Sequence, residues 1–259
     1  MKSRLDKLLF QRGLAPSRER GQALILAGRV LVNQQKVEKA GANVEEDASI
    51  RILGDDPPFV SRGGLKLARA LEHWRIDVRN KCCMDIGAST GGFTDCLLQN
   101  GASWVIAVDT GYGQMALTLR GDPRVHLLEK TNARYLTPEQ IWGGADTREP
   151  ISFIAMDVSF ISATLVLPAA VRCVRASALG KAFELVLLVK PQFEVGRAQV
   201  GKGGIVRDPQ AQQTAVTRVT GAVEELGGTE IEVIESPILG AEGNREFLLH
   251  ACFLPLPAK

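Results

Sequence analysis

Residues 82–94 read Cys-Cys-Met-Asp-Ile-Gly-Ala-Ser-Thr-Gly-Gly-Phe-Thr, and a second apolar run, Trp104-Val-Ile-Ala-Val, ends at Asp109. A strand, a glycine-rich turn, a helix and a second strand that ends in an acid are typical of a nucleotide-type cofactor pocket. Glycines allow such a turn to bend tightly and to approach a ligand closely. Asp109 follows Gly87, the first of these glycines, by 22 positions, so its carboxylate is placed to accept hydrogen bonds from two ribose hydroxyls.

The glycine turn fits two different functions. Its spacing, Gly-x-Ser-x-Gly-Gly, differs from the Gly-x-Gly-x-x-Gly that sets a pyrophosphate on a helix N-terminus, which favours an adenosine ligand without phosphates over a dinucleotide. Residues 87–91, Gly-Ala-Ser-Thr-Gly, also match the nucleophile elbow of serine hydrolases, in which a strained turn exposes the serine. The motif alone leaves both functions open.

Size and composition indicate a soluble globular protein. At 259 residues, 45% of them hydrophobic, the chain is long enough for one medium domain and a small additional one. No apolar run approaches the roughly 20 residues that span a bilayer, and the first residues lack the apolar segment of a signal peptide, so we expect a cytoplasmic protein. Five cysteines without a Cys-x-x-Cys pair and three scattered histidines predict reduced thiols and no metal site.

Positive charge is concentrated at the N-terminus. Residues 1–40 contain nine Lys or Arg and three acids, a net charge of +6, whereas the whole chain carries only +2. A polyanion partner would therefore meet the first forty residues.

The pattern of the first 56 residues predicts a small α+β domain. Leu5, Leu8 and Leu9 recur at helical spacing, and Ser17 is a candidate N-cap for a second helix that ends near Gly28. Short β segments are expected around 30–32, 37 and 50–52. Asp55-Asp-Pro-Pro58 then ends the domain because paired prolines continue neither a helix nor a ladder. We expect domains at 1–56 and 63–259, with residues 57–62 as the linker.

The second domain alternates strands with helices, which predicts an α/β fold with a mainly parallel, Rossmann-like sheet. No helical pattern separates the last two strands, so that pair should be antiparallel and the sheet mixed and seven-stranded. The strands are expected at 82–86, 104–109, 124–128, 151–157, 184–190, 230–236 and 245–253. In such sheets ligands bind beyond the carboxyl ends of the strands, where Asp85, Asp109, Asp157 and Lys190 fall.

The first domain resembles the RNA-binding domain shared by ribosomal protein S-four and many pseudouridine synthases. The resemblance is carried by Arg4-Leu-Asp-Lys-Leu-Leu, Ser17-Arg-Glu-Arg and Ala27-Gly-Arg-Val-Leu-Val-Asn33. It implies RNA binding through phosphate contacts, which would be salt-dependent and poorly sequence-specific. The candidate RNA-binding residues are Arg4, Lys7, Arg12, Arg18, Arg20, Arg29, Lys36 and, after the linker, Arg62.

Nearly the whole chain resembles the TlyA (hemolysin A) family, which joins this RNA-binding module to a methyltransferase domain related to the FtsJ ribose 2'-O-methyltransferases. The segments that carry the resemblance are Ser61-Arg-Gly-Gly-Leu-Lys-Leu67, Asp85-Ile-Gly-Ala-Ser-Thr-Gly-Gly-Phe-Thr-Asp95, Met156-Asp-Val-Ser-Phe-Ile-Ser162, Leu188-Val-Lys-Pro-Gln-Phe-Glu194, Gly201-Lys-Gly-Gly-Ile-Val-Arg-Asp208 and Gly243-Asn-Arg-Glu-Phe-Leu248. The resemblance implies 2'-O-methylation of ribose in ribosomal RNA, with cytidine as the expected nucleotide.

The same resemblance implies the site residues. The family's Lys-Asp-Lys-Glu tetrad corresponds to Lys66, Asp157, Lys190 and Glu246. Its S-adenosylmethionine pocket corresponds to the glycine turn and to acidic and amide side chains after the neighbouring strands. The candidate cofactor residues are Asp85, Gly87, Ala88, Ser89, Gly91, Gly92, Phe93, Asp109 and Asn132.

The chemistry of methyl transfer explains why lysines and carboxylates would gather there. A ribose hydroxyl is a poor nucleophile until it loses its proton, so a base must stand beside it. A lysine is normally protonated at neutral pH, but burial and a neighbouring cation both favour the neutral amine. We assign Lys190 as the base, Asp157 as its positioning group, and Lys66 and Glu246 as supporting groups. No metal is required.

Three alternatives remain at this point. A serine hydrolase would use Ser89, Asp157 and His250, which occur in the order of an α/β-hydrolase triad, although His250 lies in an apolar run and no His-Gly-Gly-Gly segment is present. A non-catalytic factor would bind ribosomal RNA during ribosome assembly. A membrane-lytic hemolysin would need a long amphipathic or transmembrane segment, and none is visible.

Overall fold

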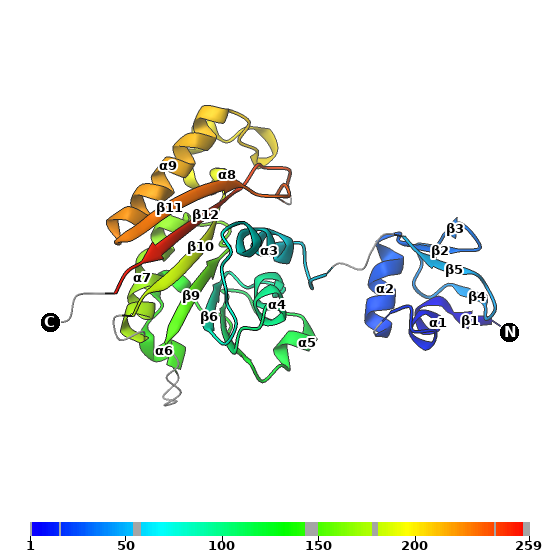
Figure 1. The fold of residues 1–259 in the computed structure, drawn as a ribbon. Helices are drawn as coiled ribbons and strands as arrows, with labels where there is room; N and C mark the ends of the chain where they lie inside the picture. Colours follow the sequence, from blue (N-terminus) through cyan, green and yellow to red (C-terminus); the bar gives the residue numbers. More distant parts are fainter. Residues whose placement is uncertain are drawn as a thin grey trace. The chain divides into compact units, whose positions relative to one another are not determined.

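The computed structural model describes residues 2–15, 17–53, 58–142, 150–177, 181–240 and 242–255. The chain divides into two compact units, Met1–Pro57 and Pro58–Lys259 (Figure 1). Of the predicted hinge Asp55–Pro58, only Pro58 lies within the described residues.

The first unit consists of two helices and two small antiparallel sheets. The helices are α1 (Leu5–Gln11) and α2 (Arg18–Leu26); the sheets pair β1 (Lys2–Arg4) with β4 (Asn43–Glu45), and β2 (Val30–Val32) with β3 (Gln35–Lys36) and β5 (Ile50–Ile52). Helix α2 begins where the sequence predicts, because the Ser17 side chain accepts a hydrogen bond from the backbone N–H of Arg20 at 3.1 Å. Strands β1 and β4 were not predicted, since three residues carry too little periodicity to be recognised.

The second unit contains the predicted mixed seven-stranded sheet. Its strand order is β11-β12-β10-β9-β6-β7-β8, with β12 antiparallel to both of its neighbours and the other pairs parallel. The strands are β6 (Cys82–Ile86), β7 (Trp104–Val108), β8 (Val125–Leu128), β9 (Ile151–Met156), β10 (Phe183–Val189), β11 (Gly228–Glu235) and β12 (Phe247–Phe253).

Helices cover both faces of this sheet (Figure 1). Apolar residues of α7 and α9 pack with one face, and those of α3 and α4 with the other, so each face has its own core. The helices are α3 (Gly63–His73), α4 (Gly92–Gln99), α5 (Leu117–Arg120), α6 (Pro138–Trp142), α7 (Ala163–Ser177), α8 (Pro191–Glu194) and α9 (Pro209–Glu225). Within the described part of the chain, no helix is both long enough and apolar enough to cross a bilayer.

The segment predicted as a linker lies against the second unit where it is described. The backbone N–H of Val60 donates to Asp95 Oδ2 at 2.7 Å, and Gln99 Nε2 donates to the carbonyl of Pro58 at 2.8 Å. Both partners belong to α4. This packing leads directly into α3, which carries Lys66.

Candidate active site

Lys190 and Asp157 meet at the carboxyl edge of the parallel strands. Asp157 directly follows β9 and Lys190 directly follows β10, and these strands are parallel neighbours. The Lys190 Nζ lies 2.6 Å from Asp157 Oδ1. The two groups form an ion pair, but this contact does not have the geometry of a hydrogen bond. The amine donates its hydrogen bond to Ser159 Oγ at 2.7 Å. Lys190 is only 8% exposed, so the pair lies in a largely dehydrated setting.

A second lysine–carboxylate pair lies beside the first. Lys66 on α3 donates to Glu246, immediately before β12, with Nζ and Oε2 2.5 Å apart. Both side chains are buried. Lys66, Glu246 and Lys190 line one cavity, and Asp157 reaches it through Lys190. The structure thus brings together four residues that span 180 positions of the sequence.

A larger cavity, of about 400 Å³, opens beside Asp157 at the ends of β6, β7 and β9. Asp109 lies on its wall and accepts hydrogen bonds from the backbone N–H groups of Ser89, at 2.8 Å, and Gly111, at 2.6 Å. Asn132 also lines the cavity, and its side chain accepts from the Arg134 N–H at 3.1 Å. A carboxylate has about four lone-pair sites, so Asp109 retains acceptors for ribose hydroxyls.

The glycine turn allows this cavity to form. Gly87 has φ +86°, and a Cβ there would clash with the carbonyl of Asp157. A Cβ on Gly92 would clash with Ser61 Oγ. Only glycine permits such close backbone approach, and it is the kind of cradle that an adenosine-type cofactor needs.

A third, smaller cavity lies between the other two. It shares Gly87, Ser89 and Asp157 with the larger cavity and Lys66 with the lysine cavity. Ala88, Gly92 and Phe93 of the predicted cofactor set line it, as does Arg62, which was predicted to bind RNA. The Arg62 guanidinium donates to the carbonyl of Leu239 at 3.0 Å, so it is fixed at the rim of the site.

Two residues of the predicted cofactor set line none of these three cavities. Gly91, at φ +95°, begins α4, and a side chain there would clash with Leu119. Asp85 is fully buried in β6; its Oδ2 accepts from Thr94 Oγ1 at 2.7 Å, and its Oδ1 has no partner. Burial raises the pKa of Asp85 to about 7, against the Thr94 hydrogen bond and with a smaller push from the charge of Asp157.

Sequence reasoning missed three residues of the site. Ser159 and Phe160 line both the larger cavity and the lysine cavity, and Gln192 lines the latter. Phe160 is 92% exposed with φ +65°, although a large aromatic side chain is usually buried. Gln192 has a buried Oε1 without a partner. Their nearness to Asp157 and Lys190 along the chain was the available signal.

The basic residues of the first unit are largely engaged within it. Asp6 is fully buried and accepts from Arg4 Nη2 at 2.9 Å, Arg18 Nε at 3.0 Å and Gln22 Nε2 at 2.8 Å. The guanidinium of Arg4, against the cost of burial, holds the pKa of Asp6 well below its usual range. Lys7, in the same helix, is exposed.

Other predicted RNA-binding residues also have partners inside the unit. Arg12 donates to the backbone carbonyls of Ala48, at 2.7 Å, and Glu46. Arg29 Nε donates to the carbonyl of Leu53 at 2.8 Å. Lys36 pairs with Glu38 at 2.9 Å, and Arg20 lies half-buried at the start of α2. The sequence therefore overstates the number of basic side chains that are free of other partners, although the net charge of the unit is unchanged by these contacts.

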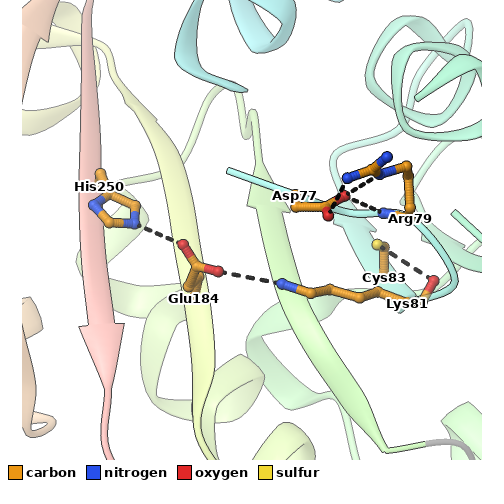
Figure 2. A network of polar contacts seen from close by, with 6 residues as sticks. All are labelled: Asp77, Arg79, Lys81, Cys83, Glu184 and His250. Atoms are coloured by element: carbon orange, nitrogen blue, oxygen red, sulfur yellow. Dashed lines mark hydrogen bonds and ion pairs between the residues drawn. The ribbon is translucent and has the colours of Figure 1, made fainter. Parts of the chain in front are cut away.

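The hydrolase triad is not assembled in the described residues. Ser89 Oγ donates to Gln114 at 3.3 Å, and Asp157 pairs with Lys190. His250 lies on β12, where its Nε2 is 3.2 Å from Glu184 Oε2. Figure 2 shows that Glu184 lies between His250 and Lys81.

Comparison with known families assigns both units. Residues 59–253 match the FtsJ-like methyltransferase family, and residues 3–50 match the S4 domain. The chain is 45% identical to the 16S/23S rRNA (cytidine-2'-O)-methyltransferase TlyA of Mycobacterium tuberculosis, over 96% of this chain and 89% of the relative. It is 40% identical to Hemolysin A of Brachyspira hyodysenteriae, over 95% of this chain and 98% of the relative.

Solved structures agree with this assignment. A hemolysin-like protein from Streptococcus thermophilus is 40% identical and superimposes with a TM-score of 0.72, over 98% of this chain and 89% of that chain. An S-adenosylmethionine dependent methyltransferase from Listeria monocytogenes, 14% identical, shares the fold with a TM-score of 0.52 over 74% of this chain and 99% of that chain.

Proposed function

Because the chain belongs to the TlyA (hemolysin A) family of FtsJ-like methyltransferases, we propose that it methylates the 2'-oxygen of a cytidine ribose in ribosomal RNA. The cofactor is S-adenosylmethionine. The proposal rests on the meeting of two lysine–carboxylate pairs, both with buried lysines, beside an adenosine-sized cavity. Because ribosomes are cytoplasmic, this substrate implies a cytoplasmic enzyme.

The larger cavity fits the cofactor. Asp109 would accept hydrogen bonds from the ribose hydroxyls of the adenosine, and Gly87 and Ser89 would bring the backbone close to it. The bound cofactor supplies a methyl group on a positively charged sulfur. Asp157 lines both this cavity and the smaller one, and it pairs with Lys190, so it lies between the expected cofactor position and the lysine.

Lys190 would act as the general base. The hydroxyl proton would pass to the Lys190 amine, which must be unprotonated at that moment, as the 2'-oxygen bonds to the methyl carbon and the methyl–sulfur bond breaks to leave a neutral thioether. Asp157 and Ser159, at 2.6 and 2.7 Å, would fix the direction of the amine. Alignment of this kind supplies a large part of the rate enhancement in group transfer.

Lys66 and Glu246 would shape the ribose cavity. Their pair is nearly neutral as a unit, so it adds little net charge next to a cationic cofactor. Gln192, with its unpartnered Oε1, offers an acceptor to a donor group of the nucleotide. The exposed ring of Phe160 beside this cavity is suited to contact a base, since unstacked RNA bases pack on aromatic side chains.

The test is methyl transfer to ribosomal subunits. The protein is incubated with each subunit and tritiated S-adenosylmethionine, and alkali-resistant positions of the RNA are mapped. We expect label on the ribose of a cytidine, because a 2'-O-methyl group blocks alkaline cleavage. Label on a base, or binding of subunits without any transfer, would overturn the proposal; the second result would identify a non-catalytic assembly factor.

A further inference from the structure

Three potential metal ligands gather at the end of the sheet opposite the proposed active site. The ligand atoms of Glu184, His250 and Cys252 all lie within 4.8 Å of one another. His250 Nε2 and Glu184 Oε2 are 3.2 Å apart. His250 is buried, and Cys252 is the one cysteine of the described residues that is not fully buried.

Strand register places these three side chains on one face. In the antiparallel pair of β10 and β12, Glu184 lies opposite Cys252, and Val186 lies opposite His250. Side chains two residues apart point to the same face of a sheet, and directly opposite residues share that face. The backbone register therefore places the three residues on one face of the sheet.

A bulge in the edge strand brings a second carboxylate, that of Glu230, near Cys252. The pairing of β11 with β12 shifts register between Thr229 and Glu232, and Glu230 within this bulge has φ +52°. Bulges re-aim side chains, and a positive φ at a non-glycine residue is a strained arrangement that calls for an explanation. This arrangement leaves the Glu230 carboxylate beside Cys252.

We propose that Glu184, Glu230, His250 and Cys252 bind a zinc ion. One sulfur, one imidazole nitrogen and two carboxylate oxygens form a ligand set that Zn²⁺ accepts in tetrahedral geometry. Calcium and magnesium prefer oxygen ligands throughout, so the sulfur and nitrogen donors select against them.

The charges of the cluster support a divalent cation. A Cys252 thiolate with two carboxylates carries a charge of −3, and Lys81, whose Nζ is 3.3 Å from Glu184 Oε1, contributes +1 (Figure 2). A divalent ion makes the sum zero.

The ion would stabilise the outer part of the sheet and would have no role in methyl transfer. Glu184 precedes Lys190 by six residues along β10, about 20 Å at the rise of a strand. The ligands come from β10, β12 and β11, so one ion ties the edge strand to the interior. The sequence predicts no metal site because Glu184 and Glu230 are far along the chain from the single His-x-Cys pair.

Cobalt substitution tests the site in the full chain. After treatment with a chelator, the protein is titrated with Co²⁺ and, separately, with Zn²⁺. We expect one ion per chain, a sulfur-to-cobalt charge-transfer band in the near ultraviolet, and a melting temperature that rises with free Zn²⁺. Zn²⁺ should also protect Cys252 from alkylation, a measurement that needs no variant.

Matched histidine variants locate the ligands. His250→Asn and Glu184→Gln should weaken Zn²⁺ binding at least about tenfold, and Cys252→Ser should remove the charge-transfer band. His73→Asn replaces an exposed histidine and should leave binding unchanged. Absence of the band and of Zn²⁺-dependent protection in the unmodified chain, or survival of the band in Cys252→Ser, would refute the site whatever the methyltransferase assay gives.

Discussion

Each unit of the molecule buries an aspartate completely, and the two are treated in opposite ways. In the first unit, Asp6 receives hydrogen bonds from Arg4, Arg18 and Gln22, and its pKa falls. In the second unit, Asp85 receives one from Thr94, while its other oxygen has no partner, and its pKa rises to about 7. Neither side chain is exposed to solvent, but Asp85 lies deep in the central sheet, where desolvation dominates, whereas Asp6 lies in a small unit, where the Arg4 hydrogen bond dominates. Depth and partners together decide the charge.

The same contrast separates the basic residues of the two units. Arg12 and Arg29 of the first unit donate to backbone carbonyls and so hold its loops in place. Lys66 and Lys190 of the second unit each pair with a carboxylate at the wall of a cavity. Saturated charges stabilise a fold, whereas charges that face a cavity are available for chemistry. Substitutions should therefore cost stability in the first group and activity in the second.

Lys190→Ala should give the largest effect. Loss of a general base lowers the rate of transfer by about 10²- to 10⁴-fold, and cofactor binding should persist because Lys190 does not line the larger cavity. The rate is measured as tritium transfer to ribosomal subunits, and cofactor affinity by calorimetry. Lys181→Ala, at an exposed lysine just before the same strand, is the matched control and should retain full activity. Equal losses in both variants would contradict the assignment of the base.

The order of elements was predictable because each carries a strong local signal. The apolar runs of β6, β7, β9 and β10 and the helical patterns between them predicted a mixed seven-stranded sheet, and the structure has it. The antiparallel last pair followed from the missing helix between β11 and β12. Strands β1 and β4 were not predicted, because each is only three residues long and the two strands pair with each other across about 40 positions of the sequence.

The site was predictable only in part. A resemblance to a family supplied Lys66 and Glu246, because nothing local marks a lysine on α3 as the partner of a glutamate 180 positions away. The charge count of the first forty residues overstated the free cations, since the bonds to Asp6 and to backbone carbonyls depend on the fold. The unpartnered Oδ1 of Asp85 is likewise a property of packing.

Asp85→Asn should stabilise the second unit in a pH-dependent way. The pKa of Asp85 rises from its ordinary 3.8 to about 7 on folding. Between these values the folded state holds a proton that the unfolded state has lost, so the free energy of unfolding falls as the pH rises. Asp85→Asn has no carboxyl group at this position, so its free energy of unfolding does not fall in this way. Its advantage over the natural chain should grow from about pH 4 to pH 7, to at most about 4 kcal/mol, and then stay constant.

Denaturation followed by tryptophan fluorescence measures this effect, because all three tryptophans lie in the second unit. Asp6→Asn is the matched control for the opposite case. Its lowered pKa stabilises the first unit above about pH 4, so this variant should lose stability at neutral pH, as followed by circular dichroism. If the free energies of unfolding of Asp85→Asn and of the natural chain differ by the same amount at every pH, then Asp85 does not titrate in this window.

The smallest effect should separate two basic residues of the first unit. Lys7 is exposed, and no described residue pairs with its side chain. Lys7→Gln should therefore remove one phosphate contact. The salt slope, which is the slope of log K for RNA binding against log salt concentration, should become shallower by about 0.7–0.9. Arg12→Gln should instead lower the free energy of unfolding by about 0.5–1.5 kcal/mol, because the carbonyls of Ala48 and Glu46 lose their donor. Filter binding to a ribosomal RNA fragment at several salt concentrations measures the slope, and circular dichroism measures the melting of the unit. A salt slope that changes in the folded Arg12 variant but not in the Lys7 variant would reverse the division between free and engaged cations.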